Sequence, residues 1–304
     1  MQVLRKYIFL LPVLFLLAAC KDERSTDDGQ NDLNKGEIAI YADTSYQSIV
    51  KELVRSYENV YPEAHINVTY AGENELMQAM YSDKTRMIIT GRGLSQQEID
   101  AIEKVNGIVP KQFVVGREAV AIISNIASVD STFDLDAFRA SRMPGYAGAY
   151  ANKLFVFNNA NAGIVGQLTG SADASYQNMF SLQNSDTLIA YVAAHPDAFG
   201  FLSFAELSDG DSEHTRQILE KVRILGVSFT DTTGQKVTVE LSQSSLGDYS
   251  YPLQRPVNVI KGNMPELLGT GFVNFLYRSK AARIFLKAGL IPDRIPERQI
   301  KIVE

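Results

Sequence analysis

The chain has 304 residues, 45% of them hydrophobic, and a formal net charge of −6 at pH 7. This acidic balance, without a basic stripe of interleaved aromatic residues, argues against nucleic-acid binding. The single cysteine excludes an internal disulfide, and none of the three histidines shares a metal-ligand spacing with another, so we predict no metal centre and no cofactor.

The N-terminus has the pattern of a secretory signal. Arg5 and Lys6 form a short basic start, and residues 8–17 are an apolar run that is too short to span a membrane as a helix. The run ends in Leu-Ala-Ala-Cys at residues 17–20, which resembles the lipobox of bacterial lipoproteins, where the cysteine carries the lipid. We therefore expect a lipoprotein signal peptide at residues 1–19 and a lipid on Cys20; an ordinary signal peptide is the alternative.

Residues 20–35 contain mainly acidic and small polar residues, with almost nothing apolar to bury, and this composition predicts a flexible tether. Removal of residues 1–19 leaves 285 residues (304 − 19), which is enough for two lobes. The net charge becomes −8 because Arg5 and Lys6 are lost. A lipid on Cys20 would hold the protein outside the cytoplasm, at the periplasmic face or on the outer membrane or cell surface, and would be its only contact with the membrane.

The next part of the chain alternates strands with helices. Branched and aromatic residues predict the strands, and apolar residues at helical spacing predict the helices. The predicted strands are residues 37–42, 66–70, 86–90 and 112–124, and the predicted helices are 49–60, 74–81 and 95–105. Such alternation predicts right-handed crossovers and a parallel sheet covered on both faces.

Residues 125–250 form a second predicted unit, after which the chain returns to the first. The predicted elements are strands at 154–157, 222–229 and 257–260, and helices at 134–141, 186–194, 266–277 and 279–288, with a turn-rich stretch at 247–252. Two strand-like crossings between the units imply a hinge and a cleft. We therefore predict lobe 1 at residues 36–123 with 253–304 and lobe 2 at 124–252.

Three loops stand where a predicted strand leads into a helix. In an open parallel sheet, ligands bind beyond the carboxyl ends of the strands, where helix N-termini present N–H groups. The predicted ligand-binding residues are Thr44, Ser45, Tyr46, Thr90, Gly91, Arg92, Asn161, Ala162 and Gly163. Helix capping alone is the alternative for Thr44 and Ser45, and a surface ion pair is the alternative for Arg92.

Three segments of the chain resemble, in the same order, those of the phosphate-binding proteins of phosphate ABC importers. T-G-R-G-L-S-Q-Q-E at residues 90–98 resembles the family's S-S-R-x-L-x-x-x-E, and Y-P-L-Q-R-P at 251–256 resembles its Y-P-L-x-R-P. G-L-I-P at 289–292, followed by P-E-R-Q-I at 296–300, resembles its G-L-x-P…P-x-R-x-I. The resemblance extends from about residue 37 to the end of the chain.

The resemblance implies an α/β fold of the type II periplasmic-binding-protein kind. It has two lobes, each a mostly parallel sheet flanked by helices, joined by a two-strand hinge. It also implies that phosphate or a related oxyanion is bound in the interlobe cleft and passed to ABC permease subunits. By the same resemblance, Thr44 and Ser45 lie at the first helix N-terminus, and Arg92 supplies the positive charge.

The chain departs from this family at the third loop. Ala162 and Ile164 stand where the family usually has Ser and Thr, and the family's tryptophan stretch is absent. A surface lipoprotein with a degenerate pocket, acting as a sensor or protein-interaction module, is therefore the alternative function. No nucleophile elbow, phosphate-cradling Gly-Lys-Ser loop or dinucleotide fingerprint is present, so we do not expect an enzyme.

Overall fold

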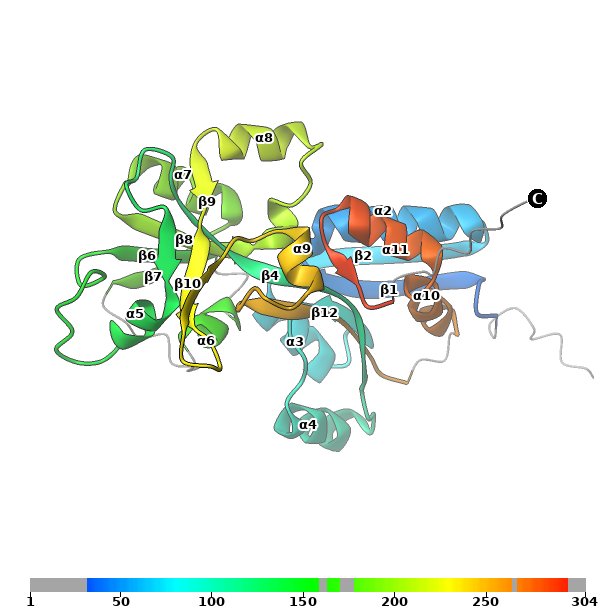
Figure 1. The fold of residues 1–304 in the computed structure, drawn as a ribbon. Coiled ribbons are helices and arrows are strands. Elements are labelled where there is room, and N and C mark those ends of the chain that lie inside the picture. Colours follow the sequence, from blue (N-terminus) through cyan, green and yellow to red (C-terminus); the bar gives the residue numbers. More distant parts are fainter. Residues whose placement is uncertain (1–31, 159–162, 170–177, 264–266, 295–304) are drawn as a thin grey trace, which may run out of the picture.

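The computed structural model describes residues 32–158, 163–169, 178–263 and 267–294. Figure 1 shows two groups of elements, with the N-terminal and C-terminal segments on one side and the middle of the chain on the other. Strands β4 and β12 run between the two groups, which we call lobe 1 and lobe 2. No helix in the described part of the chain is both long enough and apolar enough to cross a bilayer.

Lobe 1 begins with the predicted alternation of strands and helices. Its first elements are β1 (Gly36–Asp43), the 3₁₀ turn η1 (Thr44–Tyr46), α2 (Gln47–Val60), β2 (Ala64–Ala71), α3 (Glu73–Tyr81), β3 (Met87–Thr90), α4 (Gln96–Asn106) and β4 (Lys111–Asn125). The chain returns to this lobe with β12 (Gln254–Lys261), α10 (Leu268–Leu276), α11 (Ser279–Lys287) and β13 (Ile291–Pro292). Helix α11 ends before Gly289, whose φ of +75° suits glycine, as the Gly-Leu-Ile-Pro segment predicts.

Lobe 2 contains the intervening elements. They are β5 (Thr132–Asp134), α5 (Leu135–Ala140), β6 (Leu154–Asn158), α6 (Gly163–Thr169), β7 (Met179–Leu182), α7 (Ser185–Ala194), β8 (Ala198–Ser203), η3 (Phe204–Glu206), α8 (Glu213–Leu219), β9 (Val222–Ile224), β10 (Gly226–Thr230), β11 (Lys236–Val239) and α9 (Gln243–Gly247). The single strand predicted at 222–229 is wrong, because β9 pairs with β4 whereas β10 pairs with β5 and β11 in a separate small sheet.

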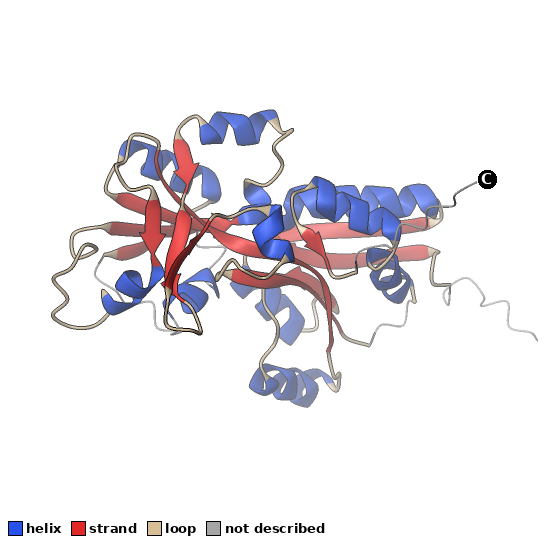
Figure 2. Cartoon of the chain, viewed as in Figure 1, coloured by secondary structure: helices blue, strands red, loops and turns tan. Residues whose placement is uncertain are grey.

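One large sheet passes through both lobes. Its strand order is β2-β1-β3-β12-β4-β8-β6-β7, with β9 and β13 also paired to β4. The pairs β1–β2, β1–β3, β6–β7 and β6–β8 are parallel, as the alternation predicts, whereas β12 and β4 are antiparallel to their neighbours. Strand β4 pairs with β12 through Ala119 and with β8 from Val120 onward. The chain therefore enters lobe 2 within one continuous strand, and Figure 2 shows this strand crossing the middle of the molecule.

Aromatic residues form much of the core in each lobe. In lobe 1, the amphipathic helix α2 buries Tyr57, whose ring lies 5.3 Å from those of Phe272 and Phe275 in α10. In lobe 2, Phe133 and Phe155 belong to a cluster of buried rings that pack between β6, β8 and α5. The residue-level limits of the lobes stay a prediction.

Candidate functional site

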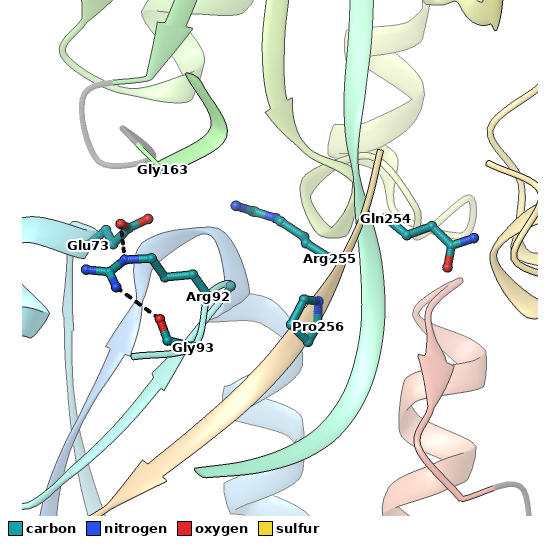
Figure 3. Close-up of a pocket in the computed structure, with 8 residues that line it drawn as sticks. Glu73, Arg92, Gly93, Gly163, Gln254, Arg255 and Pro256 are labelled. Atoms are coloured by element: carbon teal, nitrogen blue, oxygen red, sulfur yellow. Dashed lines mark hydrogen bonds and ion pairs between the residues drawn. The ribbon is translucent and has the colours of Figure 1, made fainter. Parts of the chain in front are cut away.

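A cavity of about 240 Å³ lies between the lobes, beyond the carboxyl ends of β2 and β3. Its lining residues are Glu73, Gly91, Arg92, Gly93, Gly163, Gln254, Arg255 and Pro256. We call this cavity the cleft. Figure 3 shows that lobe 1 and β12 provide most of these residues and that Gly163, at the start of α6, faces them from lobe 2. The lining includes two arginines and one glutamate.

Arg92 is already paired with carboxylates. Its guanidinium donates two hydrogen bonds to Glu98, at 2.8 and 2.9 Å, and one to Glu73 at 2.7 Å, the latter drawn in Figure 3. The hydrogen bond from Arg92 lowers the pKa of Glu98 to about 2, so this carboxyl stays charged. The ion pair considered from the sequence is therefore present, but it lies at the edge of the cleft, where the Arg92 side chain is 34% exposed.

Glu73 brings negative charge to the place where the two lobes meet. It is the first residue of α3, and its side chain is 8% exposed. A Cβ added at Gly163 would overlap both carboxylate oxygens of Glu73. The start of α6 therefore abuts a carboxylate of this chain, and the absence of a side chain at residue 163 permits this close approach.

A second arginine lies deeper in the cleft. Arg255 is 5% exposed and pairs through Nε with Glu118, its partner residue in the β4–β12 register. Its Nη2 has no hydrogen-bond partner among the described residues. Burial lowers the pKa of Arg255, but the electrostatic effects of Glu118, Tyr46 and Asp43 and the hydrogen bond to Glu118 together outweigh burial and raise it, so the guanidinium remains charged.

Glu118 joins both lobes at the hinge. It is fully buried in β4, and it accepts hydrogen bonds from Tyr46 at 2.6 Å, from Ser203 of lobe 2 and from Arg255. The backbone N–H of Ala205 lies 3.3 Å from the same carboxylate. A charge this deep in the protein needs such partners, because each desolvated oxygen must otherwise go without a hydrogen bond. We call this set of contacts the Glu118 network.

The structure divides the residues predicted from the first loop. Tyr46 is fully buried and belongs to the Glu118 network, with its hydroxyl 2.6 Å from where a Gly91 Cβ would stand. Thr44 and Ser45 line a different cavity, described below as the hydroxyl groove. Neither caps a helix: Asp43 caps η1 by accepting from the N–H of Ser45, and Tyr46 precedes α2 without a side-chain cap.

The other predicted residues lie at the cleft or outside the described residues. Gly91, Arg92 and Gly163 line the cleft. Thr90 is fully buried at the end of β3, and its Oγ1 has no partner among the described residues. Asn161 and Ala162 fall outside the residues that the structure describes, so their predicted role stays a prediction.

Sequence reasoning missed the most buried charges of the site. Glu118 and Arg255 stand opposite each other in antiparallel strands, and Glu73 begins a helix. The available signal was the pair of opposite charges, Glu118 just before the apolar run 119–123 and Arg255 within the Tyr-Pro-Leu-Gln-Arg-Pro segment. When two opposite charges lie within buried hinge strands, we expect them to pair and neutralise each other.

Two further acids lie close to the Glu118 network. Burial raises the pKa of Asp43 to about 6 and that of Glu206 to about 7. Each has one carboxyl oxygen, Oδ2 or Oε1, that is covered from solvent without a hydrogen-bond partner among the described residues. Within the described ranges, no group of three or more acidic, histidine or cysteine side chains is arranged to hold a metal ion.

Comparison with known proteins places this geometry in a wider context. A family model described as "PBP superfamily domain" matches residues 27–280. A candidate phosphate ABC transporter substrate-binding protein from Clostridium perfringens, solved with bound phosphate, superposes with a TM-score of 0.67 at 15% identity, over 85% of this chain and 100% of its own. An ABC-type phosphate transport receptor from Vibrio cholerae gives a TM-score of 0.62 at 15% identity, over 84% and 100% of the two chains.

The same fold also occurs in a regulatory protein. The CcmR regulatory domain of Synechocystis PCC6803, in complex with 2-PG, superposes with a TM-score of 0.52 at 11% identity, over 80% of this chain and 96% of its own. None of the curated proteins compared matches the chain by sequence. The superpositions confirm the predicted α/β two-lobed fold, and at identities this low they show the fold alone.

Proposed function

Because the chain belongs to the periplasmic-binding-protein (PBP) superfamily, a group of binding folds, we propose that it captures phosphate or a related oxyanion in its cleft. The observation that carries the proposal is Arg255. This arginine is buried at the cleft, stays charged, and has an Nη2 group without a partner among the described residues. A charged N–H donor that lacks a partner is well suited to an oxyanion, since such hydrogen bonds contribute about 1.5–3 kcal/mol each.

The carboxylate of Glu73 favours one type of oxyanion. Glu73 also lines the cleft and can only accept hydrogen bonds when it is ionised. A fully deprotonated ion would be repelled by it, whereas hydrogenphosphate or hydrogenarsenate offers an O–H to Glu73 and oxygens to Arg255. We therefore rank phosphate and arsenate above sulfate and molybdate.

The site of action follows from the N-terminal pattern and is part of the same proposal. A lipid on Cys20 and the tether at residues 20–35 would hold the protein on the outer side of a membrane. From there the closed, loaded form would pass its anion to the permease subunits of an ABC importer. Hinge closure around a ligand is the usual motion of two-lobed binding proteins, and β4 and β12 would form the hinge here.

Titration calorimetry of the purified protein with phosphate, arsenate, sulfate and molybdate tests the proposal. We expect saturable binding of phosphate or arsenate in the micromolar range or tighter and at least about tenfold weaker binding of sulfate, a difference of about 1.4 kcal/mol. Gly163→Ala should weaken phosphate binding, because its Cβ would displace Glu73 from the place where the lobes meet. Gly210→Ala is the matched control, since nothing lies within 4 Å of the added Cβ.

A second function is favoured by a specific observation: Arg92 is held by both Glu73 and Glu98. If these two carboxylates take up Arg92 and leave it unable to bind an anion, the protein would be a surface lipoprotein with a degenerate pocket, acting as a sensor or protein-interaction module. In that case none of the four oxyanions would bind at millimolar concentration, whether to the wild type, to Gly163→Ala or to Gly210→Ala. Such a result would overturn the transport proposal.

A further inference from the structure

The second cavity between the lobes has a composition unlike that of the cleft. It has a volume of about 430 Å³, within the range of roughly 300–1,000 Å³ that is common for small-molecule sites. We call it the hydroxyl groove, because the side chains lining it include those of Thr44, Ser45, Ser48, Ser212 and Thr215. Its walls come from η1 and α2 in lobe 1 and from η3, α8 and the segment between them in lobe 2, and it shares no described lining residue with the cleft.

One acid in this groove has a covered oxygen that lacks a hydrogen-bond donor. Glu206 lines the groove, and its Oε1 is covered from solvent with no partner among the described residues. The side chain also hydrogen-bonds Ser185, so one oxygen remains to be satisfied. A buried acceptor without a donor is costly, and a ligand that brings an N–H or O–H would remove that cost.

The charges around Glu206 favour a cation over a neutral donor. The negative charges of Asp43 and Glu118 act on Glu206, and Arg255 is the cation that opposes them. Lys51 also lines the groove, but its ammonium lies 5.8 Å from the Tyr70 ring centroid, so it is directed toward that ring. Burial is the main cause that raises the pKa of Glu206 to about 7, and the charges of Asp43 and Glu118 act in the same direction.

We propose that the hydroxyl groove binds a small primary ammonium compound, with Glu206 as its counter-ion and the hydroxyls of Thr44, Ser48 and Ser212 as further acceptors. An ammonium group carries three N–H donors and one positive charge. The first matches the surrounding acceptor oxygens, and the second matches the excess of buried carboxyls. This inference is independent of the oxyanion proposal, since it concerns a different cavity.

The Glu118 network connects the groove to the cleft. The N–H of Ala205, which lines the groove, and the guanidinium of Arg255, which lines the cleft, both approach the Glu118 carboxylate. Both cavities are also lined from both lobes. Occupation of one would therefore change the affinity of the other, and the coupling would be reciprocal.

Thermal unfolding of the purified protein with ethanolamine and putrescine tests the inference, with tetramethylammonium as the control because it has the charge but no N–H. We expect the primary amines to raise Tm by roughly 5 °C or more at a hundredfold excess over Kd. Tetramethylammonium should give no shift. Glu206→Gln should abolish the amine response, whereas Glu213→Gln, which removes an exposed carboxylate of α8 paired with Arg216, should keep it. An absent amine shift, an equal tetramethylammonium shift, or an unchanged response in Glu206→Gln would each overturn the inference.

The pH dependence of the wild-type response keeps the test decisive if Glu206→Gln fails to fold. Ethanolamine should bind more tightly at pH 8 than at pH 6, because Glu206 loses its proton in this window. The titratable and charged groups that act on Glu206 or line the groove with it are Asp43, Lys51, Glu118, Asp209, His214 and Arg255. His214 also lines the groove, so the slope is also measured in His214→Gln. A flat or reversed slope in both proteins contradicts the inference.

Discussion

At the scale of single residues, the hinge strands β4 and β12 are joined by a buried ion pair between Glu118 and Arg255. Two opposite charges, 5% and 0% exposed, face each other across β12 and β4. Their mutual attraction offsets the desolvation of both ions only as long as both are present. The remaining Nη2 group of Arg255 has no partner among the described residues and is the donor that the proposed oxyanion would meet.

Removal of one member of this pair should be more harmful than removal of both. Arg255→Met leaves Glu118 as a buried, uncompensated charge, and we expect a loss of about 3–5 kcal/mol in the free energy of unfolding. The double variant Arg255→Met, Glu118→Gln should recover a large part of this loss, since no buried charge remains. Denaturant unfolding of the two single variants and the double variant measures the coupling. Equal stability of Arg255→Met and the wild type would show that Glu118 does not depend on this partner.

The individual contacts of the site cannot be predicted from the sequence. That Thr44 and Ser45 follow a strand was predictable, but the sequence does not show that Asp43 accepts from the N–H of Ser45. Likewise, Arg92 was identified as a charged loop residue, yet its partner Glu73 is 19 residues away in the chain. Such pairings depend on how closely two elements pack, and local pattern carries no information about that distance.

At the scale of elements, the segment that leads from β3 into α4 is held in place by hydrogen bonds among its own side chains. Ser95 caps α4 by accepting from the N–H of Glu98, and the Glu98 side chain accepts in return from the N–H of Ser95. The same Glu98 receives the guanidinium of Arg92. The Thr-Gly-Arg-Gly-Leu-Ser-Gln-Gln-Glu segment therefore maintains the loop geometry at the cleft edge through three side chains.

Loss of the cap should weaken this element by a measurable amount. Ser95→Ala removes the side-chain acceptor at the start of α4, and we expect a destabilisation of about 1 kcal/mol in denaturant unfolding. Gln97→Ala, at an exposed position in the same first turn, should stay within about 0.5 kcal/mol of the wild type. If both variants unfold alike, the cap contributes nothing beyond helix propensity.

Much of the element order was predictable because most strands and helices have clear periodicity. The predicted strands 37–42, 66–70, 86–90 and 112–124 all lie within β1, β2, β3 and β4, apart from one residue before β3. Strand β8 was missed: its sequence, AFGFLS, is buried at every position and so lacks the alternation of a half-exposed strand. Helix α8 was missed because, of its seven residues, only Thr215 and Ile218 are buried.

At the scale of the whole molecule, two acids, one in each lobe, affect how the stability of the protein responds to pH. Asp43 at the end of β1 and Glu206 in η3 both have raised pKa values, about 6 and about 7, because burial disfavours their charged forms. A raised carboxyl pKa means that the folded state holds a proton that the unfolded state has lost. Each acid thus stabilises the fold most below its unfolded pKa.

Stability should therefore fall as the pH rises from about 4 to about 7. Each acid taken alone accounts for about 3 kcal/mol over this window, since one pKa unit corresponds to about 1.4 kcal/mol. Asp43→Asn and Glu206→Gln should each flatten part of the decline in Tm between pH 4 and pH 8. Glu98 acts in the opposite sense: its lowered pKa gives stability that is lost as the pH falls toward 2. A Tm that rises between pH 4 and pH 7 in the wild type would contradict this assignment.

The continuity of β4 also limits how the molecule can be divided. This strand provides the backbone partner of β8 in lobe 2 while its first half belongs to lobe 1. A fragment that began at residue 124 would leave β8 unpaired on one side, with all six of its residues normally buried. An isolated lobe 2 would then expose an apolar strand edge that invites association with other chains, so lobe 2 requires β4 to remain soluble.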